Sequence, residues 1–417
     1  MRLLSQARRP VSSTAEAPFA SSVRRERRTV LFVNTPTRPP LGADTWIHGR
    51  IMAALDREAY EPVSACVFGP TGARTPTYEL LHRLPGLELR PTSFGPELNG
   101  LRGRARRRAV LSTVAALGSI GRLAWFVRRR RIPIIHTSDR PRDAAVCVVL
   151  ARLTGAKCVV HVHVGVGDWM QGMLRWALRR ADALVAVSTF VAETLVQSGH
   201  RPDRVHVVLN AIEPERWTPG LGRADARSEL GIGPDDPVVI TVCRLFPAKG
   251  PAELVRAISV LRDRHPAVRL VVVGGEMTPG FRAELEALVT SCDAERNVIF
   301  TGRRDDVERL MGAADVYAMP SLYEPFGLVY AEAMAMRLPV VALDNGGTPE
   351  VVEHGVTGLL SPAGDHDALV KHLGVLLDDP AYRDALGSAG RARVERHFTA
   401  QRMARDVAAV YERIGHT

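Results

Sequence analysis

The sequence lacks the markers of several protein classes. It has no CxxC pair and no His/Cys spacing typical of a metal site, and its five cysteines are scattered over 417 residues. An odd, dispersed set of cysteines is typical of reduced thiols, so we expect a cytoplasmic protein. No apolar segment follows the first arginines, which argues against a secretory signal. No repeat at a solenoid period is evident.

A full G-x-G-x-x-G fingerprint is also missing. Gly274–Gly275 follows an apolar run as in a dinucleotide turn, but without the remaining glycine a nicotinamide site is disfavoured. Two arginine runs, 102–108 and 128–131, have few aromatic residues among them on which bases would stack. Nucleic acid is therefore not expected as a partner.

Charge is unevenly distributed along the chain. The net charge is +10, but residues 1–212 carry 32 basic against 15 acidic side chains, and the remainder carries 23 against 30. Such a division indicates two domains with different partners. The basic half suits a phosphorylated acceptor or an anionic membrane surface, so we expect peripheral contact with the inner membrane face through this half.

The apolar stretch 109–127 approaches one membrane thickness in length. It is interrupted by serines, glycines and Arg122. A helix that packs on the core is therefore favoured over a membrane span. An interfacial helix held by the flanking arginines is a third interpretation.

Short apolar runs alternate with helical patterns, and this alternation occurs twice. Runs at 29–34 and 158–163 belong to the first half, and the pattern restarts at 238–242 and continues to 340–343. Continuous apolar runs are typical of parallel strands covered on both faces. The sequence therefore predicts an α/β protein with two Rossmann-like, doubly wound parallel-sheet domains that face each other across a cleft.

These patterns divide the chain into five parts. The polar, aperiodic start is expected to be a disordered tail. The parts are the tail (1–28), an N-terminal domain (29–213), an interdomain connection (214–236), a C-terminal domain (237–398) and a C-terminal helix (399–417).

The segment Pro320–Met336, PSLYEPFGLVYAEAMAM, is the most informative one. A turn and then a helix beginning near Gly327 would aim free backbone N–H groups into the cleft, which suits a phosphate or a charged sugar ring. Glu324 precedes this helix, and Glu332 lies about a turn and a half inside it. A carboxylate at Glu332 can accept two hydroxyls of a ribose.

Two cations follow the strand predicted at 238–242. Arg244 comes almost directly after it and Lys249 five residues later, so both can clamp a diphosphate at the strand end. A leaving nucleoside diphosphate gains negative charge as the glycosidic bond breaks. Cations placed there stabilise the transition state more than the ground state. They would thus take the part that a Lewis-acidic metal ion plays in other enzymes.

Together these motifs resemble the retaining glycosyltransferases of family 4, which have the GT-B fold. The resemblance covers nearly the whole chain after residue 28, and Val187–Ser188 and Asn210–Ala211–Ile212 are similar to the family's end-of-domain markers. It implies a nucleotide-sugar donor bound by the C-terminal domain, an acceptor bound by the N-terminal domain, metal-independent transfer and retention of configuration. The matching motifs are Arg244-x4-Lys249-Gly250, Glu324-Pro-Phe-Gly-x4-Glu332-Ala-Met-Ala and Gly346-Gly-Thr-Pro-Glu350.

The resemblance also implies a role for individual residues. Arg244 and Lys249 would hold the donor diphosphate. Glu324 would contact hydroxyls of the transferred sugar, and Glu332 would bind ribose. His163 resembles a histidine placed near the reacting centre.

Backbone groups complete the implied donor site. The backbone of Phe326, Gly327 and Leu328 would approach the sugar and phosphates, and Gly42 matches a glycine-rich loop after the first strand. The chain departs from the family pattern in that loop, where Ala43 stands in place of a second glycine. It also has Ala211 after Asn210, and Arg337 where glycine is usual.

Other polar residues have plainer interpretations. His161 and His163 share one face of a strand, because strand side chains alternate. For His161 a structural role is favoured, and for His136 that role is at least as well supported as a functional one. Asp305–Asp306 lacks a third ligand, so a helix N-terminal cap is favoured over a metal site.

The sequence thus predicts metal-independent, retaining transfer of a hexosyl unit from a UDP- or GDP-sugar to an acceptor hydroxyl in cell-envelope glycan or glycolipid synthesis. No metal cofactor is expected, and the acceptor is a carbohydrate, a lipid-linked sugar or a small molecule. A GT-B epimerase or hydrolase is an alternative that would consume donor without acceptor. A non-catalytic nucleotide-sugar-binding protein is another, although the intact acid and cations argue against it. A dehydrogenase is disfavoured by the missing fingerprint.

Overall fold

The computed structural model describes most of the chain. Of the tail expected at residues 1–28, all but the last two residues lie outside the described part. Side chains of the helix that begins at Gly103 are described from residue 115 onward. The described residues are 27–37, 41–68, 74–95, 103–167, 170 and 172–415.

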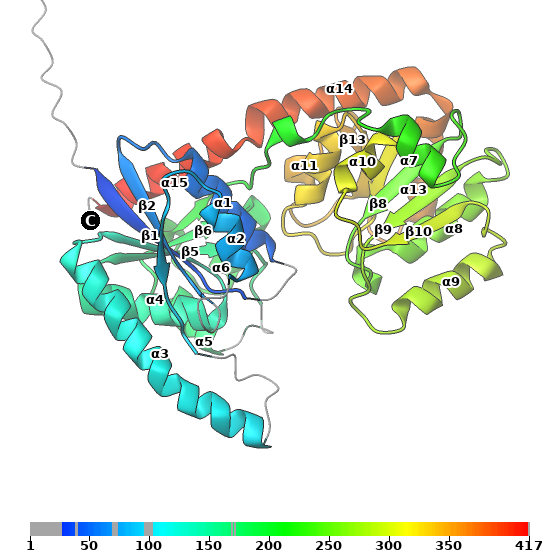
Figure 1. Cartoon of the computed structure of the whole chain (residues 1–417). Helices are drawn as coiled ribbons and strands as arrows, with labels where there is room; N and C mark the ends of the chain where they lie inside the picture. Colours follow the sequence, from blue (N-terminus) through cyan, green and yellow to red (C-terminus); the bar gives the residue numbers. More distant parts are fainter. Residues whose placement is uncertain are drawn as a thin grey trace, which may run out of the picture.

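The first half of the chain forms one parallel sheet in the order β3-β2-β1-β4-β5-β6-β7, with helices on both faces (Figure 1). Its strands are β1 (Arg28–Asn34), β2 (Tyr60–Cys66), β3 (Glu88–Pro91), β4 (Ile134–Ser138), β5 (Lys157–Val162), β6 (Ala183–Ala186) and β7 (Val205–Val207). Its helices are α1 (Ala43–Ala54), α2 (Pro76–His82), α3 (Gly103–Arg129), α4 (Pro141–Thr154), α5 (Gly172–Leu178), α6 (Thr189–Gln197) and the 3-10 turn η2 (Pro202–Arg204).

The second half forms another parallel sheet, in the order β10-β9-β8-β11-β12-β13. Its strands are β8 (Val238–Val242), β9 (Arg269–Val273), β10 (Val298–Gly302), β11 (Val316–Met319), β12 (Val340–Leu343) and β13 (Gly358–Ser361). The helical elements around it are η3 (Pro214–Arg216), α7 (Arg223–Glu229), η4 (Pro247–Lys249), α8 (Pro251–Leu261), α9 (Phe281–Ser291), α10 (Val307–Gly312), α11 (Leu328–Ala335), α12 (Thr348–Val351) and α13 (His366–Asp378).

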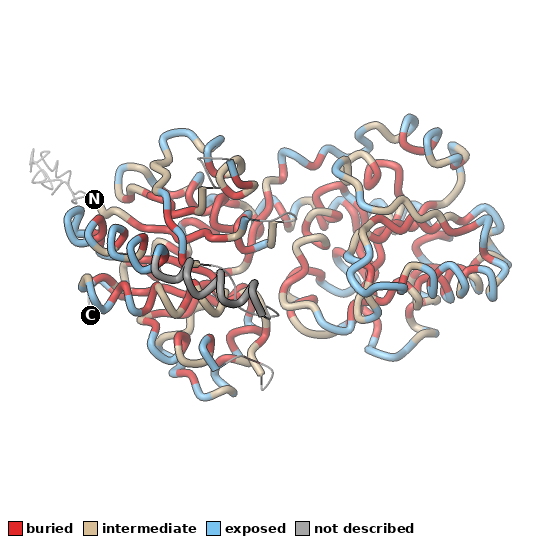
Figure 2. Tube along the Cα trace, turned by 60° about the horizontal axis from the view of Figure 1, so that its bottom comes forward, coloured by how far each residue is buried: buried red, intermediate tan, exposed pale blue. Residues whose placement is uncertain are grey.

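The prediction of two doubly wound domains is confirmed. The central strands are buried on both faces, as their unbroken apolar runs required (Figure 2). In each sheet the strand order reverses once, between β1 and β4 and between β8 and β11. Open sheets of this kind bind ligands beyond the carboxyl ends of the strands at such a switch point, so the two switch points define where the site is to be sought.

The chain ends by returning to its first domain. Helix α14 (Pro380–His397) runs along the second domain, and α15 (Ala400–Gly415) packs against α1 in the first (Figure 1). The buried side of α15 includes Val407 and Tyr411, and the Tyr411 hydroxyl lies 2.6 Å from Nδ1 of His136. The two domains are therefore joined by a second crossing as well as by the connection around η3.

Helix α3 covers the first sheet. Ala116, Leu123 and Val127 are buried on one side of it, and the helix contacts α4. This confirms the core-packing interpretation for the part of the helix whose side chains are described. Among the described residues, no helix is both long enough and apolar enough to cross a bilayer.

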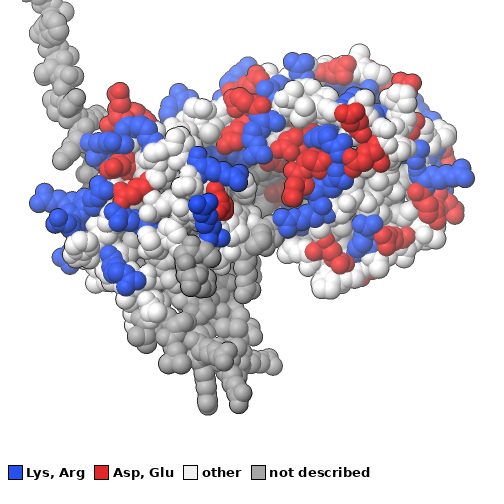
Figure 3. Space-filling model, viewed as in Figure 1, with Lys and Arg blue, Asp and Glu red and all other residues white. Residues whose placement is uncertain are grey.

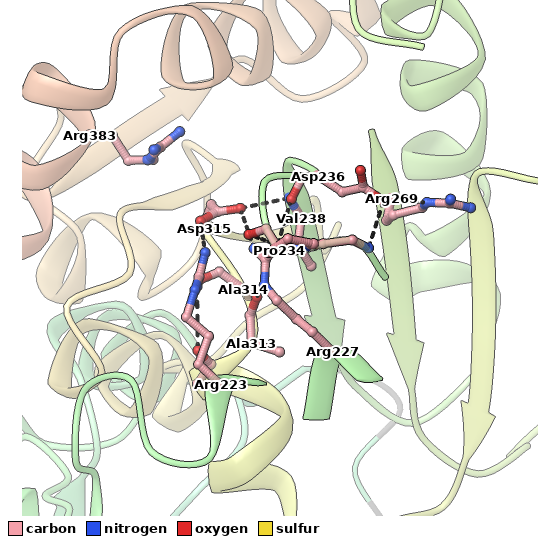
Figure 4. A network of polar contacts seen from close by, with 12 residues as sticks. Arg223, Arg227, Pro234, Asp236, Val238, Arg269, Ala313, Ala314, Asp315 and Arg383 are labelled. Atoms are coloured by element: carbon pink, nitrogen blue, oxygen red, sulfur yellow. Dashed lines mark hydrogen bonds and ion pairs between the residues drawn. The ribbon is translucent and has the colours of Figure 1, made fainter. Parts of the chain in front are cut away.

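One buried arginine fastens the interdomain connection to the second domain. Arg227 of α7 is 4% exposed. Its guanidinium donates to the backbone carbonyls of Gly233, Pro234, Asp236 and Ala313 at 2.8–3.0 Å, and to Asp315 Oδ2 at 3.0 Å (Figure 4). A delocalised guanidinium can satisfy several acceptors at once, which no other side chain does as well.

We predict that Arg227→Met lowers the free energy of unfolding of the second domain by about 3–5 kcal/mol, because it strands buried acceptors and removes a charge partner of Asp315. Denaturant unfolding followed by tryptophan fluorescence and circular dichroism measures this. Arg201→Met is the matched control, since Arg201 pairs with Asp203 on the surface, and an effect within about 0.5 kcal/mol is expected there. Equal effects of the two substitutions would contradict this account.

Candidate active site

The residues that the sequence singled out converge on one cavity of about 240 Å³ between the domains. Arg244 and Lys249 follow β8, and Glu324 follows β11, so all three lie at the switch point of the second sheet. The first domain contributes Ala43 and His163 to the same wall. The cavity thus lies where the topology of both sheets predicts a ligand.

Glu324 and Lys249 form an ion pair at the cavity wall. Their side chains are 12% and 13% exposed, and Lys249 Nζ lies 2.7 Å from Glu324 Oε2. Arg244 is exposed, and its guanidinium lies 5.9 Å from the centre of the Phe246 ring. Arg244 therefore keeps its charge available to a ligand, while Lys249 is already held in place.

Helix α11 starts at the cavity, as predicted. Gly327 is its N-cap, with φ of 94°, and Phe326, Gly327 and Leu328 line the wall. The first N–H groups of a helix have no acceptor within the helix, so they face the cavity as donors for an anion. A positive φ of this size favours glycine, and a Cβ at Gly327 would also meet the Tyr330 ring at 2.3 Å.

Two further glycines hold the loop that carries Glu324. A Cβ on Gly346 would lie 2.5 Å from the Glu324 carbonyl oxygen, and a Cβ on Gly347 would lie 2.2 Å from that of Pro325. Gly347 N–H donates to the Glu324 carbonyl at 2.8 Å. The Gly346-Gly-Thr-Pro-Glu350 motif therefore owes its glycine pair to the close approach of two loops.

The same two loops contact the first domain. The Glu350 carboxylate accepts from the N–H groups of Thr189 and Phe190, at the start of α6, at 2.7 and 3.0 Å. The Tyr323 hydroxyl accepts from Gly165 N–H at 2.6 Å, and Ser188 Oγ donates to the Pro325 carbonyl at 2.6 Å. These contacts hold the domains together beside the cavity. Sequence patterns missed them, because nothing local couples residues so far apart.

Gly42 is the N-cap of α1 and comes directly before Ala43 of the cavity wall. Its backbone is extended (φ −70°). A Cβ there would lie 2.3 Å from Asp44 Oδ1. Asp44 is held by Arg140, whose Nε and terminal nitrogen lie 2.6 and 3.3 Å from its oxygens. Burial opposes ionisation of Asp44, but the hydrogen bond and charge of Arg140 prevail and lower its pKa. The sequence did not single out this ion pair.

Two predicted site residues, Gly42 and Glu332, are not among those that line the cavity, and Glu332 is the farther along its element. It lies further along α11, half-buried. Burial raises its pKa to about 7, although the nearby Arg50 favours the carboxylate. Arg50 donates to the Ala211 carbonyl at 2.8 Å, in the segment that resembled an end-of-domain marker.

The cap predicted at Asp305–Asp306 is correct in position but wrong in its hydrogen bond. Asp306 is the N-cap residue of α10, yet its side chain makes no capping bond. Both of its oxygens instead accept from Arg304, and one also from Arg309, and these hydrogen bonds lower the pKa of Asp306. The two arginines therefore occupy the carboxylate oxygens of Asp306 that would otherwise accept from a backbone N–H group of α10.

Arg337, where glycine is usual in the resembling family, has a φ of 59°. L-residues rarely adopt this left-handed conformation. The close packing of α14 on this turn accompanies it, since a Cβ on Gly387 would lie 2.1 Å from the Arg337 carbonyl oxygen. The departure from the family pattern at Arg337 therefore lies outside the cavity.

The fold matches that of solved GT-B structures. HepE of Anabaena, solved in complex with UDP and glucose, superposes with a TM-score of 0.74 at 24% identity, covering 92% of this chain and 99% of its own. A superposition over nearly the whole of both chains confirms the prediction of a GT-B architecture.

Two family models match the sequence itself, Glycosyltransferase Family 4 over residues 70–216 and Glycosyl transferases group 1 over 222–393. The α-maltose-1-phosphate synthase of Mycolicibacterium smegmatis is 34% identical over 264 residues, 60% of this chain and 67% of its own. The GDP-mannose-dependent monoacylated α-(1-6)-phosphatidylinositol monomannoside mannosyltransferase of Corynebacterium glutamicum is 32% identical over 294 residues, 66% and 75%. The chain belongs to the family 4, group 1 glycosyltransferases.

Proposed function

We propose that this glycosyltransferase moves a hexosyl unit from a UDP- or GDP-sugar to an acceptor hydroxyl, without a metal and with retention of configuration. The observation that carries the proposal is the grouping of Arg244, Lys249 and Glu324 around one cavity at the switch point of the second sheet. HepE binds UDP, and the C. glutamicum relative uses GDP-mannose, which supports a nucleoside diphosphate as the common element.

We assign each residue a role that its place around the cavity supports. Arg244, Lys249 and the N-terminus of α11 would stabilise the departing diphosphate as its charge grows. Glu324, oriented by its ion pair with Lys249, would accept hydroxyls of the transferred sugar. The acceptor hydroxyl would attack from the face that the diphosphate leaves, and a leaving phosphate oxygen would take its proton. His163 would face the reacting centre from the first domain.

The acceptor would bind against the first domain and be phosphorylated or lipid-linked. The excess of basic residues in the first half supports this, as do the sugar phosphate and phosphatidylinositol in the names of the two relatives. Such acceptors occur in cell-envelope glycan and glycolipid synthesis.

The test is turnover of UDP- and GDP-hexoses in the presence of EDTA, with and without a panel of hexose phosphates, inositol phosphates and phosphoinositides. NMR of the product should show the anomeric configuration of the donor. Inverted product would overturn retention, and loss of turnover on chelation would overturn metal independence. Donor consumption that needs no acceptor would instead identify a hydrolase or an epimerase.

For ribose binding we expect a pH dependence. The folded pKa of Glu332 is raised from 4.5 to about 7, so its ionisation disfavours the unliganded fold, and this contribution to stability falls as pH rises through that window. A ligand whose ribose hydroxyls donate to the Glu332 carboxylate favours the ionised form of Glu332 instead. Nucleoside diphosphate affinity should therefore rise about tenfold more between about pH 6 and pH 8 in the wild type than in Glu332→Gln. Calorimetric titration measures both profiles, and parallel profiles would exclude the role.

We also propose that the chain works in the cytoplasm, with its first domain at an anionic membrane surface. The end of α3 farthest from the second domain carries exposed Arg128 and Arg129 together with Trp125, which is 66% exposed, and exposed Arg131 follows the helix. Basic side chains gather on this side of the first domain (Figure 3). Each arginine near such a surface contributes about 1 kcal/mol. Sedimentation with anionic vesicles should retain the wild type and lose an Arg128→Ala/Arg129→Ala variant. Equal sedimentation of the wild type with zwitterionic vesicles would contradict the proposed contact with an anionic surface.

A further inference from the structure

Four histidines cluster in the interior of the first domain beside the cavity. His48 comes from α1, His136 from β4 and His161 from β5, while His163 directly follows β5. The His161 and His163 rings stack with centroids 4.5 Å apart, and the His48 ring lies 5.9 and 6.3 Å from them. The shared face of His161 and His163 was predicted from strand alternation, but the approach of the other two was not.

Their ring nitrogens are short of partners. Within the part of the chain that the structure describes, neither nitrogen of His161 or His163 has a hydrogen bond, and Nε2 of His48 has none. His48 and His161 are fully buried. An unpaired buried polar group costs about 1–3 kcal/mol, so this many in one place calls for a ligand.

His48 is already oriented as a metal ligand. Asn34 Nδ2 donates to Ser64 Oγ at 3.0 Å, which turns Asn34 Oδ1 towards His48 Nδ1 at 2.8 Å. His48 Nδ1 must then carry the proton, which leaves the lone pair on Nε2. Metal-binding histidines generally donate their second ring N–H to such an oxygen, because it fixes the tautomer and the ring orientation.

We propose that His48, His161 and His163 bind one divalent transition-metal ion of the zinc class. One ligand atom from each of the three lies within 4.8 Å of the others. Ligands 2.0–2.1 Å from a tetrahedral zinc lie roughly 3.3 Å apart, so the three ligand atoms would have to approach one another by up to roughly 1.5 Å on binding the ion. Three imidazoles favour zinc, copper or nickel over magnesium or calcium.

The proposed ion belongs to the acceptor domain. His163 lines the cavity from the first domain, across from Arg244 and Lys249 of the second. The ion would fix the His163 ring at that wall and tie α1 to the end of β5. With three protein ligands, its fourth position remains for water, and the ion takes no part in the proposed transfer. The site does not rest on the proposed transfer reaction, and its test reads metal binding alone.

The experiment uses untagged full-length protein, stripped with a chelator and titrated with zinc chloride. We expect one zinc per chain by elemental analysis, and a rise in melting temperature with zinc but not with magnesium. X-ray absorption at the zinc edge should show three imidazole nitrogens at about 2.0 Å. A spectrum without imidazole ligands, or no stoichiometric uptake, would overturn the proposal without any variant.

Substitutions then locate the ion. His48→Gln and His161→Gln should each weaken zinc binding at least about tenfold. His136→Gln is the matched control, because His136 is equally buried but lies outside the three-residue set, and it should retain the ion. Undiminished binding by the folded His48→Gln and His161→Gln proteins would place the zinc elsewhere and contradict the assignment.

Discussion

Glu324→Gln is expected to lower kcat/KM for sugar transfer by about 10²–10³-fold with the fold intact. Glutamine has nearly the same shape but lacks the charge that accepts sugar hydroxyls and that pairs with Lys249 at 2.7 Å. Because that contact should strengthen as the sugar ring gains positive charge, most of the loss should appear in kcat. Steady-state kinetics with the best donor and acceptor measure it.

Glu253→Gln is the control for this substitution. Glu253 lies on the surface of the same domain in an ion pair with Arg256, so its replacement should leave the kinetics unchanged. Full turnover by Glu324→Gln would remove this residue from the mechanism, and with it the central contact of the proposed donor site.

Lys249→Ala is expected to reduce kcat by a comparable factor, about 10²–10³. It removes one of two cations at the diphosphate and leaves the Glu324 carboxylate without its partner. Affinity for the free nucleoside diphosphate should fall as well, because the product carries the full charge that the transition state only develops. Single-turnover kinetics and calorimetric titration measure the two effects.

Lys371→Ala removes an exposed lysine of α13 and is the matched control. Arg244→Lys separates charge from geometry at the second cation. It keeps the charge but loses the planar guanidinium that binds two phosphate oxygens at once. If Lys249→Ala binds the diphosphate as tightly as the wild type does, the assignment of these cations is wrong.

Much of the fold was predictable because buried parallel strands have unbroken apolar sequences. Strands β8 and β12 begin and end at the predicted residues. Strand β1 begins one residue before the expected 29–34 and ends with it. Strands β3 and β13 were missed, since both lie at sheet edges and have short sequences, ELRP and GLLS, without a distinctive apolar run.

The candidate site was likewise predictable only in part. Residues directly after a strand, such as Arg244 and Glu324, could be placed because topology alone brings strand ends together. The contacts of Glu350 with α6 and of Asp44 with Arg140 depend on how the domains and loops meet, which no local pattern encodes. For Glu332 the helix and the turn were predictable, but its distance from the cavity wall was not.

The most direct test of the donor assignment is a thermal-shift panel of nucleoside diphosphates and their sugars, run on the wild type, Glu332→Ala and Lys249→Ala. A ligand well above its Kd raises the melting temperature by mass action. We predict that one base stands out for the wild type and that both variants lose its shift. A wild-type protein that no nucleotide stabilises would contradict the donor site and favour a vestigial one.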